Sequence, residues 1–173
     1  MARQLWLLRH AEAEPHGTRS DAERRFTVRG EDQARAAGLA LARLEPNFDE
    51  VLFSPKARAR QTAELAAEKW GEEQRRRLRA HPPLAGGFDA KAALDALAAT
   101  SADGRLLLVG HEPDLSRLVG ELTGGIADLK KGGLAVLRLE GSRGELVVLI
   151  RPRELALIAD AALGVVVSPA DGD

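Results

Sequence analysis

The sequence predicts a three-layer α/β/α sandwich, in which helices cover both faces of a mostly parallel central sheet. Short apolar runs alternate with longer stretches where Ala and Leu recur at helical spacing, as is typical of layered α/β domains. A chain of 173 residues suits one domain, which at this size buries roughly 70% of its unfolded surface. We therefore expect a single domain over residues 1–165 and a frayed tail over 166–173.

The first half of the chain is expected to contain three strands and two helices. Gln4–Leu8 predicts a first strand, because it is too short and too continuously apolar for an exposed helix. Pro46 stops the first helix and Gly71 ends the second. In order, the elements after the first strand are a helix at Asp32–Leu44 entered through Gly30 and Glu31, a strand at Glu50–Phe53, a helix at Ala57–Trp70 and a short edge strand at Arg75–Ala80.

The second half predicts a further helix, a buried strand and a hairpin between two more helices. Arg105–Val109, with the sequence RLLLV, has the strongest strand pattern in the chain. The helix after it has Pro113 near its first turn, where a missing N–H costs nothing. In order, the other elements are a helix at Ala90–Ala99, the helix at Pro113–Leu122, a hairpin of Gly133–Leu139 and Glu145–Ile150 around Gly141–Gly144, and a helix at Glu154–Leu163.

Composition excludes several classes of protein. A net charge of -1 argues against a dedicated binder of nucleic acid or of acidic membranes, so any attraction for anions must come from local basic clusters. The absence of cysteine excludes disulfides, thiolate metal sites and cysteine catalysis. The N-terminus lacks the apolar region of a signal peptide, and no apolar run approaches the roughly 18 residues of a membrane span. We therefore expect a cytoplasmic protein without nucleic-acid or membrane partners.

Three segments share one arrangement, in which an apolar strand precedes a polar motif and then a loop or helix start. They are LWLLRHAEAE with Arg9 and His10, VLFSPKARARQTA with Arg58 and Arg60, and LLLVGHEPDLS with His111. Residues just past the carboxyl ends of parallel strands converge on one crevice. The helix near Pro113 would also turn its N-terminal N–H groups toward that crevice, which favours an anion. Two imidazoles and two or more guanidiniums beside a helix N-terminus predict a phosphate pocket.

The same motifs resemble those of a known family. Leu8–Glu12 resembles the Arg-His-Gly signature of the histidine phosphatase superfamily, and Ala11 stands where that signature has Gly. Ser54–Ala63 resembles its Ser-Pro…Arg-Ala…Gln-Thr-Ala segment, and Gly110–Pro113 resembles its second-histidine segment. Within the superfamily the closest likeness is to the small SixA-type phosphohistidine phosphatases, whose patterns are similar to Arg24–Gly30, Asp128–Gly133 and Arg151-Pro152.

The resemblance implies the phosphoglycerate mutase-like fold and metal-independent hydrolysis of a phosphoryl group through a covalent phosphohistidine on His10. It implies that Arg9 and Arg58 clamp the phosphoryl oxygens and that His111 donates a hydrogen bond to them. The same arginines would disfavour a positive charge on His10 and so keep it a neutral nucleophile. Arg24 and Glu112 are further candidates at the pocket rim. No metal or cofactor is expected, because guanidinium groups supply the positive charge.

One departure from the family bears on the substrate. Phosphoglycerate mutase-like members carry an acidic proton donor in mid-chain, whereas Leu84–Asp89 offers only Asp89, which is more simply the N-cap of the following helix. The remaining candidate donors are Glu12, Glu14 and Glu112. An alkoxide leaves poorly without a strong acid, but a P–N bond is labile once its ring nitrogen is protonated. The sequence therefore favours a phosphoramidate, above all a phosphohistidine carried by another protein, or an activated phosphoester.

Three alternatives remain open from the sequence. The first is a general phosphomonoesterase acting on small phosphorylated metabolites or nucleotides. The second is a phosphate-pocket binding module without activity, although His10, His111 and Arg9 are all present. The third is a metal-dependent hydrolase that uses His10 and His111 as ligands.

Overall fold

A computed structural model describes residues 2–161, which contain a six-stranded sheet in the order β3-β2-β4-β1-β5-β6. The first four strands in that order run parallel, while β5 is antiparallel to both of its neighbours. The predicted mostly parallel sheet is thus confirmed. The strands are β1 (Arg3–Arg9), β2 (Glu50–Phe53), β3 (Leu78–Ala80), β4 (Arg105–Gly110), β5 (Leu134–Glu140) and β6 (Arg143–Ile150).

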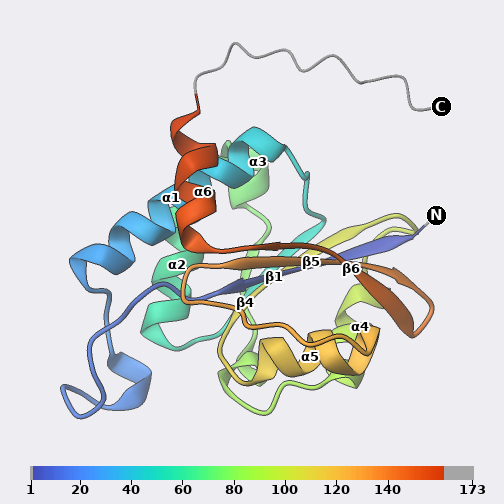
Figure 1. Ribbon diagram of the computed structural model, residues 1–173, viewed down its shortest axis with the longest axis horizontal. Helices are drawn as coiled ribbons and strands as arrows, with labels where there is room; N and C mark the ends of the chain where they lie inside the picture. The colour runs from blue at the N-terminus through green and yellow to red at the C-terminus, as the bar shows by residue number, and fades with distance from the viewer. Residues whose placement is uncertain (1, 162–173) are drawn as a thin grey trace.

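Helices cover both faces of this sheet, as the three-layer prediction requires. The α-helices are α1 (Val28–Leu44), α2 (Ala57–Ala67), α3 (Glu72–Arg75), α4 (Ala90–Ala98), α5 (Asp114–Thr123) and α6 (Pro152–Asp160), and two 3-10 turns are η1 (Asp21–Glu23) and η2 (Pro82–Ala85). Figure 1 shows α1, α2 and α6 on one side of the sheet and α4 and α5 on the other. No helix among residues 2–161 is long and apolar enough to cross a membrane.

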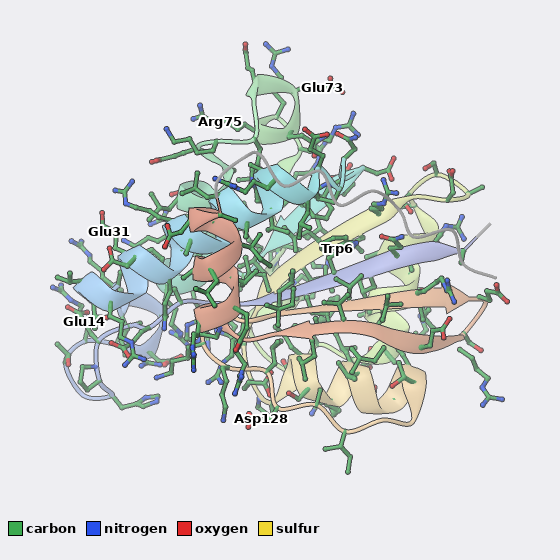
Figure 2. The ribbon with its side chains drawn as sticks, turned by 45° about the horizontal axis from the view of Figure 1, so that its top comes forward. Trp6, Glu14, Glu31, Glu73, Arg75 and Asp128 are labelled. Atoms are coloured by element: carbon green, nitrogen blue, oxygen red, sulfur yellow. The ribbon has the colours of Figure 1, made fainter. Side chains whose placement is uncertain are left out.

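The alternating side chains of the strands build two cores. On β1, Leu5 and Leu7 belong to the core beneath α4 and α5, while Leu8 belongs to the core beneath α1, α2 and α6. Trp6, labelled in Figure 2, packs against the second core. Its ring meets that of Phe48 edge to face, with the two centroids 5.4 Å apart. Both cores consist mostly of Leu, Ala and Val side chains, as the aromatic content of 3% requires.

Several predicted boundaries were wrong. The first helix begins at Val28 rather than Asp32, because the Thr27 side chain caps it by accepting a hydrogen bond from the N–H of Gly30. The second helix ends at Ala67, three residues before Trp70. The basic run predicted as a strand at Arg75–Ala80 begins instead with the last residue of α3, and only its last three residues pair with β2 at the sheet edge.

The predicted C-terminal hairpin and last helix are both present, with different first residues. The hairpin is confirmed, with β6 beginning at Arg143 and so including Gly144 in the strand. The last helix begins at Pro152, where the ring fits the first turn, rather than at Glu154. Residues 162 and 163 of that predicted helix, and the predicted tail at 166–173, lie outside the described residues.

The parallel strands bring the three predicted motifs to one edge of the sheet. Arg9 on β1 pairs with Gly110 on β4, and Phe53 on β2 pairs with Val109 on the same strand. The three strands therefore end level with one another. His10, Ser54 and His111 are the next residues along the chain, and the register places them side by side.

Candidate active site

A cavity of about 750 Å³ opens at the carboxyl ends of β1, β2 and β4. The residues that line it include all of the predicted site residues, which come from four separate segments of the chain. They are Arg9, His10, Arg24, Arg58, His111 and Glu112. Arg60, by contrast, is exposed and does not line this cavity, as expected for a residue two positions further along the same helix.

His10 is held in one tautomer. Its Nδ1 lies 2.7 Å from the carbonyl oxygen of Ala11, which can only accept, so Nδ1 carries the proton. In the neutral ring Nε2 then bears the lone pair, and the Nε–H of Arg58 donates to it at 3.3 Å. The ring is 6% exposed. A neutral, oriented imidazole with its free nitrogen beside a guanidinium can act as a nucleophile toward phosphorus.

The surroundings keep His10 unprotonated. Burial lowers its pKa to about 3, and the neighbouring His111, Arg58 and Arg9 act in the same direction against the opposing effect of the Ala11 carbonyl. Burial is the main cause of this shift, and the ring is therefore neutral throughout the physiological pH range.

His111 lies beside His10, with the two ring centroids 5.1 Å apart. Its Nε2 is 2.7 Å from the hydroxyl oxygen of Ser54 at the end of β2, and Ser54 is fully buried. Burial, followed by Arg58 and Lys56, lowers the pKa of His111 to about 4. The other ring nitrogen, Nδ1, is buried with no hydrogen-bond partner among the described residues, so a protonated Nδ1 could donate to an anionic oxygen.

Arg9 shows the same pattern of incomplete pairing. One terminal nitrogen, Nη1, donates to the carbonyl of Leu129 at 2.9 Å, which anchors the guanidinium to the loop before β5. Its Nε is buried and has no partner among residues 2–161. Because buried polar atoms are nearly always hydrogen-bonded, these atoms of Arg9 and His111, two residues that line the same cavity, indicate that the cavity suits an anion.

Asp21 on η1 is a site residue that the sequence analysis missed. Its side chain accepts hydrogen bonds from Arg24 and Lys56 at 2.8 Å and from Arg58 Nη2 at 3.3 Å, and its carbonyl accepts from Arg58 Nη1 at 2.6 Å. Lys56 above all, followed by Arg24 and Arg58, holds the pKa of Asp21 well below its usual range. No periodicity marks a loop acid of this kind, so only its position among basic motifs could have suggested it.

The predicted rim residue Arg24 is buried and belongs to this cluster. Its Nε and Nη2 bind Asp21, and its Nη1 donates to the carbonyl of Glu14 at 2.8 Å. It therefore contacts the cavity while holding the loop between β1 and α1 in place. Lys56, which the sequence analysis also missed as a site residue, supplies a further cation from the start of α2.

Glu112 lines the cavity but has a structural task at the start of α5. Its Oε1 accepts a hydrogen bond from the N–H of Ser116, and the N–H of Leu115 donates to the carbonyl of His111. These two N–H groups are thus bonded within the chain. The prediction that the α5 N-terminus turns its N–H groups to the anion was wrong for both of them.

The candidate proton donors are all engaged with other groups. Asp89 does not line the cavity and caps α4 by accepting from the N–H of Ala92, as its simpler interpretation predicted. Glu12 accepts from the hydroxyl of Thr27, and Glu14 accepts from Arg19 and from the N–H of Arg25. The N–H of Arg25 is the main cause that lowers the pKa of Glu14.

The charge in this site comes from cationic side chains. Among residues 2–161, no three His, Asp or Glu side chains come together as ligands of a metal ion would. The groups that could hold a ligand here are guanidinium, ammonium and imidazole, and they suit a phosphoryl group bound through its oxygens.

Comparisons with known proteins agree with this geometry. The profile of the Histidine phosphatase superfamily (branch 1) matches residues 5–81, which contain Arg9, His10 and Arg58. An uncharacterised protein of Picosynechococcus sp. is 32% identical over 170 residues, or 88% of this chain and 98% of the relative.

Two solved structures of similar size share the fold. A protein histidine phosphatase SixA complexed with tungstate is 26% identical with a TM-score of 0.75, covering 88% of this chain and 99% of that one. A putative phosphohistidine phosphatase SixA from Nakamurella multipartitia is 28% identical with a TM-score of 0.72, covering 88% and 97%. With these matches, the chain belongs to the histidine phosphatase superfamily, and this membership supports phosphatase activity.

Proposed function

We propose that this protein is a metal-independent phosphatase of the SixA type, which removes the phosphoryl group from a phosphohistidine carried by another protein. The observation that carries the proposal is the Nε2 lone pair of His10, oriented by the Ala11 carbonyl and placed beside Arg58. We propose the cytoplasm as its compartment, and a chain without cysteine is compatible with that reducing environment.

The reaction would proceed in two displacements. In the first, Nε2 of His10 attacks phosphorus, a P–N bond forms on His10, and the P–N bond to the substrate ring breaks as that ring takes up a proton from solvent. In the second, water attacks phosphorus, the bond to His10 breaks, inorganic phosphate leaves, and a proton of the attacking water returns to solvent. Arg9, Arg58 and the unpaired Nδ1 of His111 would bind the phosphoryl oxygens in both steps.

The carboxylates of the cavity support a leaving group that needs no strong acid. Asp21 is held by three cations, and Asp114 accepts hydrogen bonds from the N–H of Phe88 and from Arg117. Glu12, Glu14 and Glu112 accept the bonds described above. A histidine ring is a better leaving group than an alkoxide, so a site without a free acid favours phosphohistidine over phosphate esters.

The mid-chain segment gives the substrate ring room. Ala85, Gly86 and Gly87 line the cavity at the place where related enzymes carry an acid, and none of them has a functional side chain. A Cβ built on Gly86 or on Gly87 would meet no atom within 4 Å. The open space can therefore receive an imidazole displayed on another protein.

Trapping of the covalent intermediate tests the proposal. Incubation with a phosphohistidine protein labelled on phosphorus should transfer the label to the enzyme through an acid-labile, base-stable bond. The label should be absent from a His10→Ala variant and should form equally in EDTA. Label retained in that variant would assign another nucleophile, and loss of activity in EDTA would indicate a metal-dependent hydrolase.

A substrate panel separates the proposed activity from a general phosphomonoesterase. Turnover of phosphohistidine protein should exceed turnover of phosphoserine and 3-phosphoglycerate by about 10² or more, the usual contribution of a general acid that this site lacks. Comparable rates on all three would contradict the proposed substrate while leaving His10 as the nucleophile. No turnover of any of them would favour the inactive binding module.

A further inference from the structure

A second hollow of about 420 Å³ adjoins the candidate active site. It lies where the N-terminal turn of α6 meets the start of α1 and the loop before β5, and we call it the basic groove. Its charged lining consists of six cations and one acid, namely Arg9, Arg29, Lys130, Lys131, Arg151, Arg153 and Glu12. This concentration of positive charge contrasts with the net charge of -1 for the chain.

Ion pairs within the described residues neutralise only part of this charge. Arg151 pairs with Glu154 at 2.7 Å, and Lys130 pairs with Asp128 at 2.5 Å. Arg29 is 3.8 Å from Glu12 and its side chain is 75% exposed. Lys131 and Arg153 are exposed and form no ion pair with a described residue. The groove therefore retains a net positive field that an acidic ligand would meet.

The basic groove is continuous with the catalytic cavity. Arg9, Glu12 and Lys131 line both hollows, so the two share a wall. Arg9 stands at the junction with its buried Nε unpaired. A chain that places a phosphoryl group against Arg9 and His10 can run directly into the groove, and its neighbouring side chains would meet Arg29, Arg151 and Arg153.

We infer that the basic groove binds an acidic segment of the phosphoprotein substrate, next to the residue that carries the phosphoryl group. This inference rests on the proposed function and names the partner's recognition surface. None of the described residues that line the groove is aromatic, so these residues offer no stacking platform of the kind typical of single-stranded nucleic-acid sites. Charge complementarity at an exposed rim acts mainly on the rate of encounter, and thus on kcat/KM at low salt.

A charge-reversal pair with a matched control tests the inference. The double variant Arg151→Ser/Arg153→Glu changes one paired and one unpaired arginine of the groove, and neither residue lines the catalytic cavity. The control Arg75→Glu/Arg76→Ser makes the same change of charge in an exposed cluster in which Arg76 pairs with Glu72. In Figure 2 Arg75 lies at the opposite side of the molecule from Asp128, the partner of Lys130.

The substrates are an acidic phosphohistidine protein and phosphoimidazole, which has no flanking residues. For the groove variant, kcat/KM on the protein should fall about tenfold at low ionic strength, and the fall should shrink as salt is raised from about 20 to 200 mM. Its kcat/KM on phosphoimidazole, and both values for the control variant, should match the wild type.

The other outcomes are distinguishable. If the groove variant keeps the wild-type kcat/KM on a phosphohistidine protein that the wild type dephosphorylates, the inference that the basic groove binds the substrate is refuted, and the proposed function is unaffected. Equal losses on protein and phosphoimidazole would show damage to the catalytic site instead of lost recognition. A small substrate with two phosphoryl groups can be assayed as well. If the groove variant loses kcat/KM on that substrate and not on the protein, the assignment of a protein partner is overturned. Failure of the wild type on phosphohistidine protein would overturn both proposals.

Discussion

Replacement of His10 should remove a defined part of the acid sensitivity of the fold. A histidine in the unfolded chain has a pKa near 6.5, whereas burial lowers that of folded His10 to about 3. Above the higher value neither state binds the proton. As the pH falls from about 6.5 toward 3, the unfolded chain takes up a proton that the folded protein excludes, and stability is lost.

The size of the effect follows from these two values. At about pH 5 the protonation of unfolded His10 costs the folded state about 2 kcal/mol relative to pH 8. His111, whose pKa is lowered to about 4, adds a contribution of the same sign. His10→Asn keeps a donor for the Ala11 carbonyl but has no group that titrates, so its stability should depend less on pH.

Urea unfolding at about pH 8 and pH 5, in buffers without phosphate and at constant ionic strength, measures the difference. The free energy of unfolding should fall from about pH 8 to about pH 5 in both proteins. The fall for His10→Asn should be smaller than the fall for the wild type by about 2 kcal/mol. Equal falls for wild type and His10→Asn would refute the argument that burial keeps this ring neutral.

Three further predictions concern the site and the packing that supports it. Asp21→Asn removes the carboxylate that competes for three cations, so inorganic phosphate should bind about tenfold more tightly by calorimetry, and weaker binding would contradict that competition. Gly86→Glu supplies the missing acid at a position with free space, so kcat/KM on 3-phosphoglycerate should rise about 10²-fold. Gly86→Gln is the matched control, and an equal rise in that variant would refute an acid role. Gly38→Ala would place a Cβ 2.3 Å from the carbonyl oxygen of Ala66, so unfolding in urea should show a loss of about 3 kcal/mol, and an unchanged midpoint would contradict close packing of α1 on α2.

The central part of the site could be predicted because it depends on strand ends. Arg9, His10 and His111 each follow an apolar run, and parallel neighbours carry such residues to one edge of the sheet. Arg58 was assigned to the pocket from the family likeness of its motif, and the structure places its Nε against His10. The predictions for Arg9, His10 and His111 use the apolar pattern of the chain and the direction of the strands, whereas the prediction for Arg58 uses the resemblance.

Residues in loops could not be predicted in the same way. Asp21 enters the site because η1 folds back over the start of α2, and no pattern in a polar loop encodes that approach. Glu112 was expected to contact substrate, yet its carboxylate also accepts from Ser116 and supports the first turn of α5. Both cases depend on which donors lie nearby in space, and burial patterns carry no information about them.

The sequence by itself determined the layered architecture, a mostly parallel sheet and the presence of two histidines among arginines. Those features follow from apolar periodicity and from the chemistry of single side chains. Only the tertiary structure decided that His10 is neutral with its lone pair on Nε2, because that state needs burial and an arginine 48 positions away. It likewise decided that the acids of the cavity are engaged and that a basic groove continues from Arg9. Hydrogen bonds and desolvation act between residues that the fold brings together, so they appear only once the chain is packed.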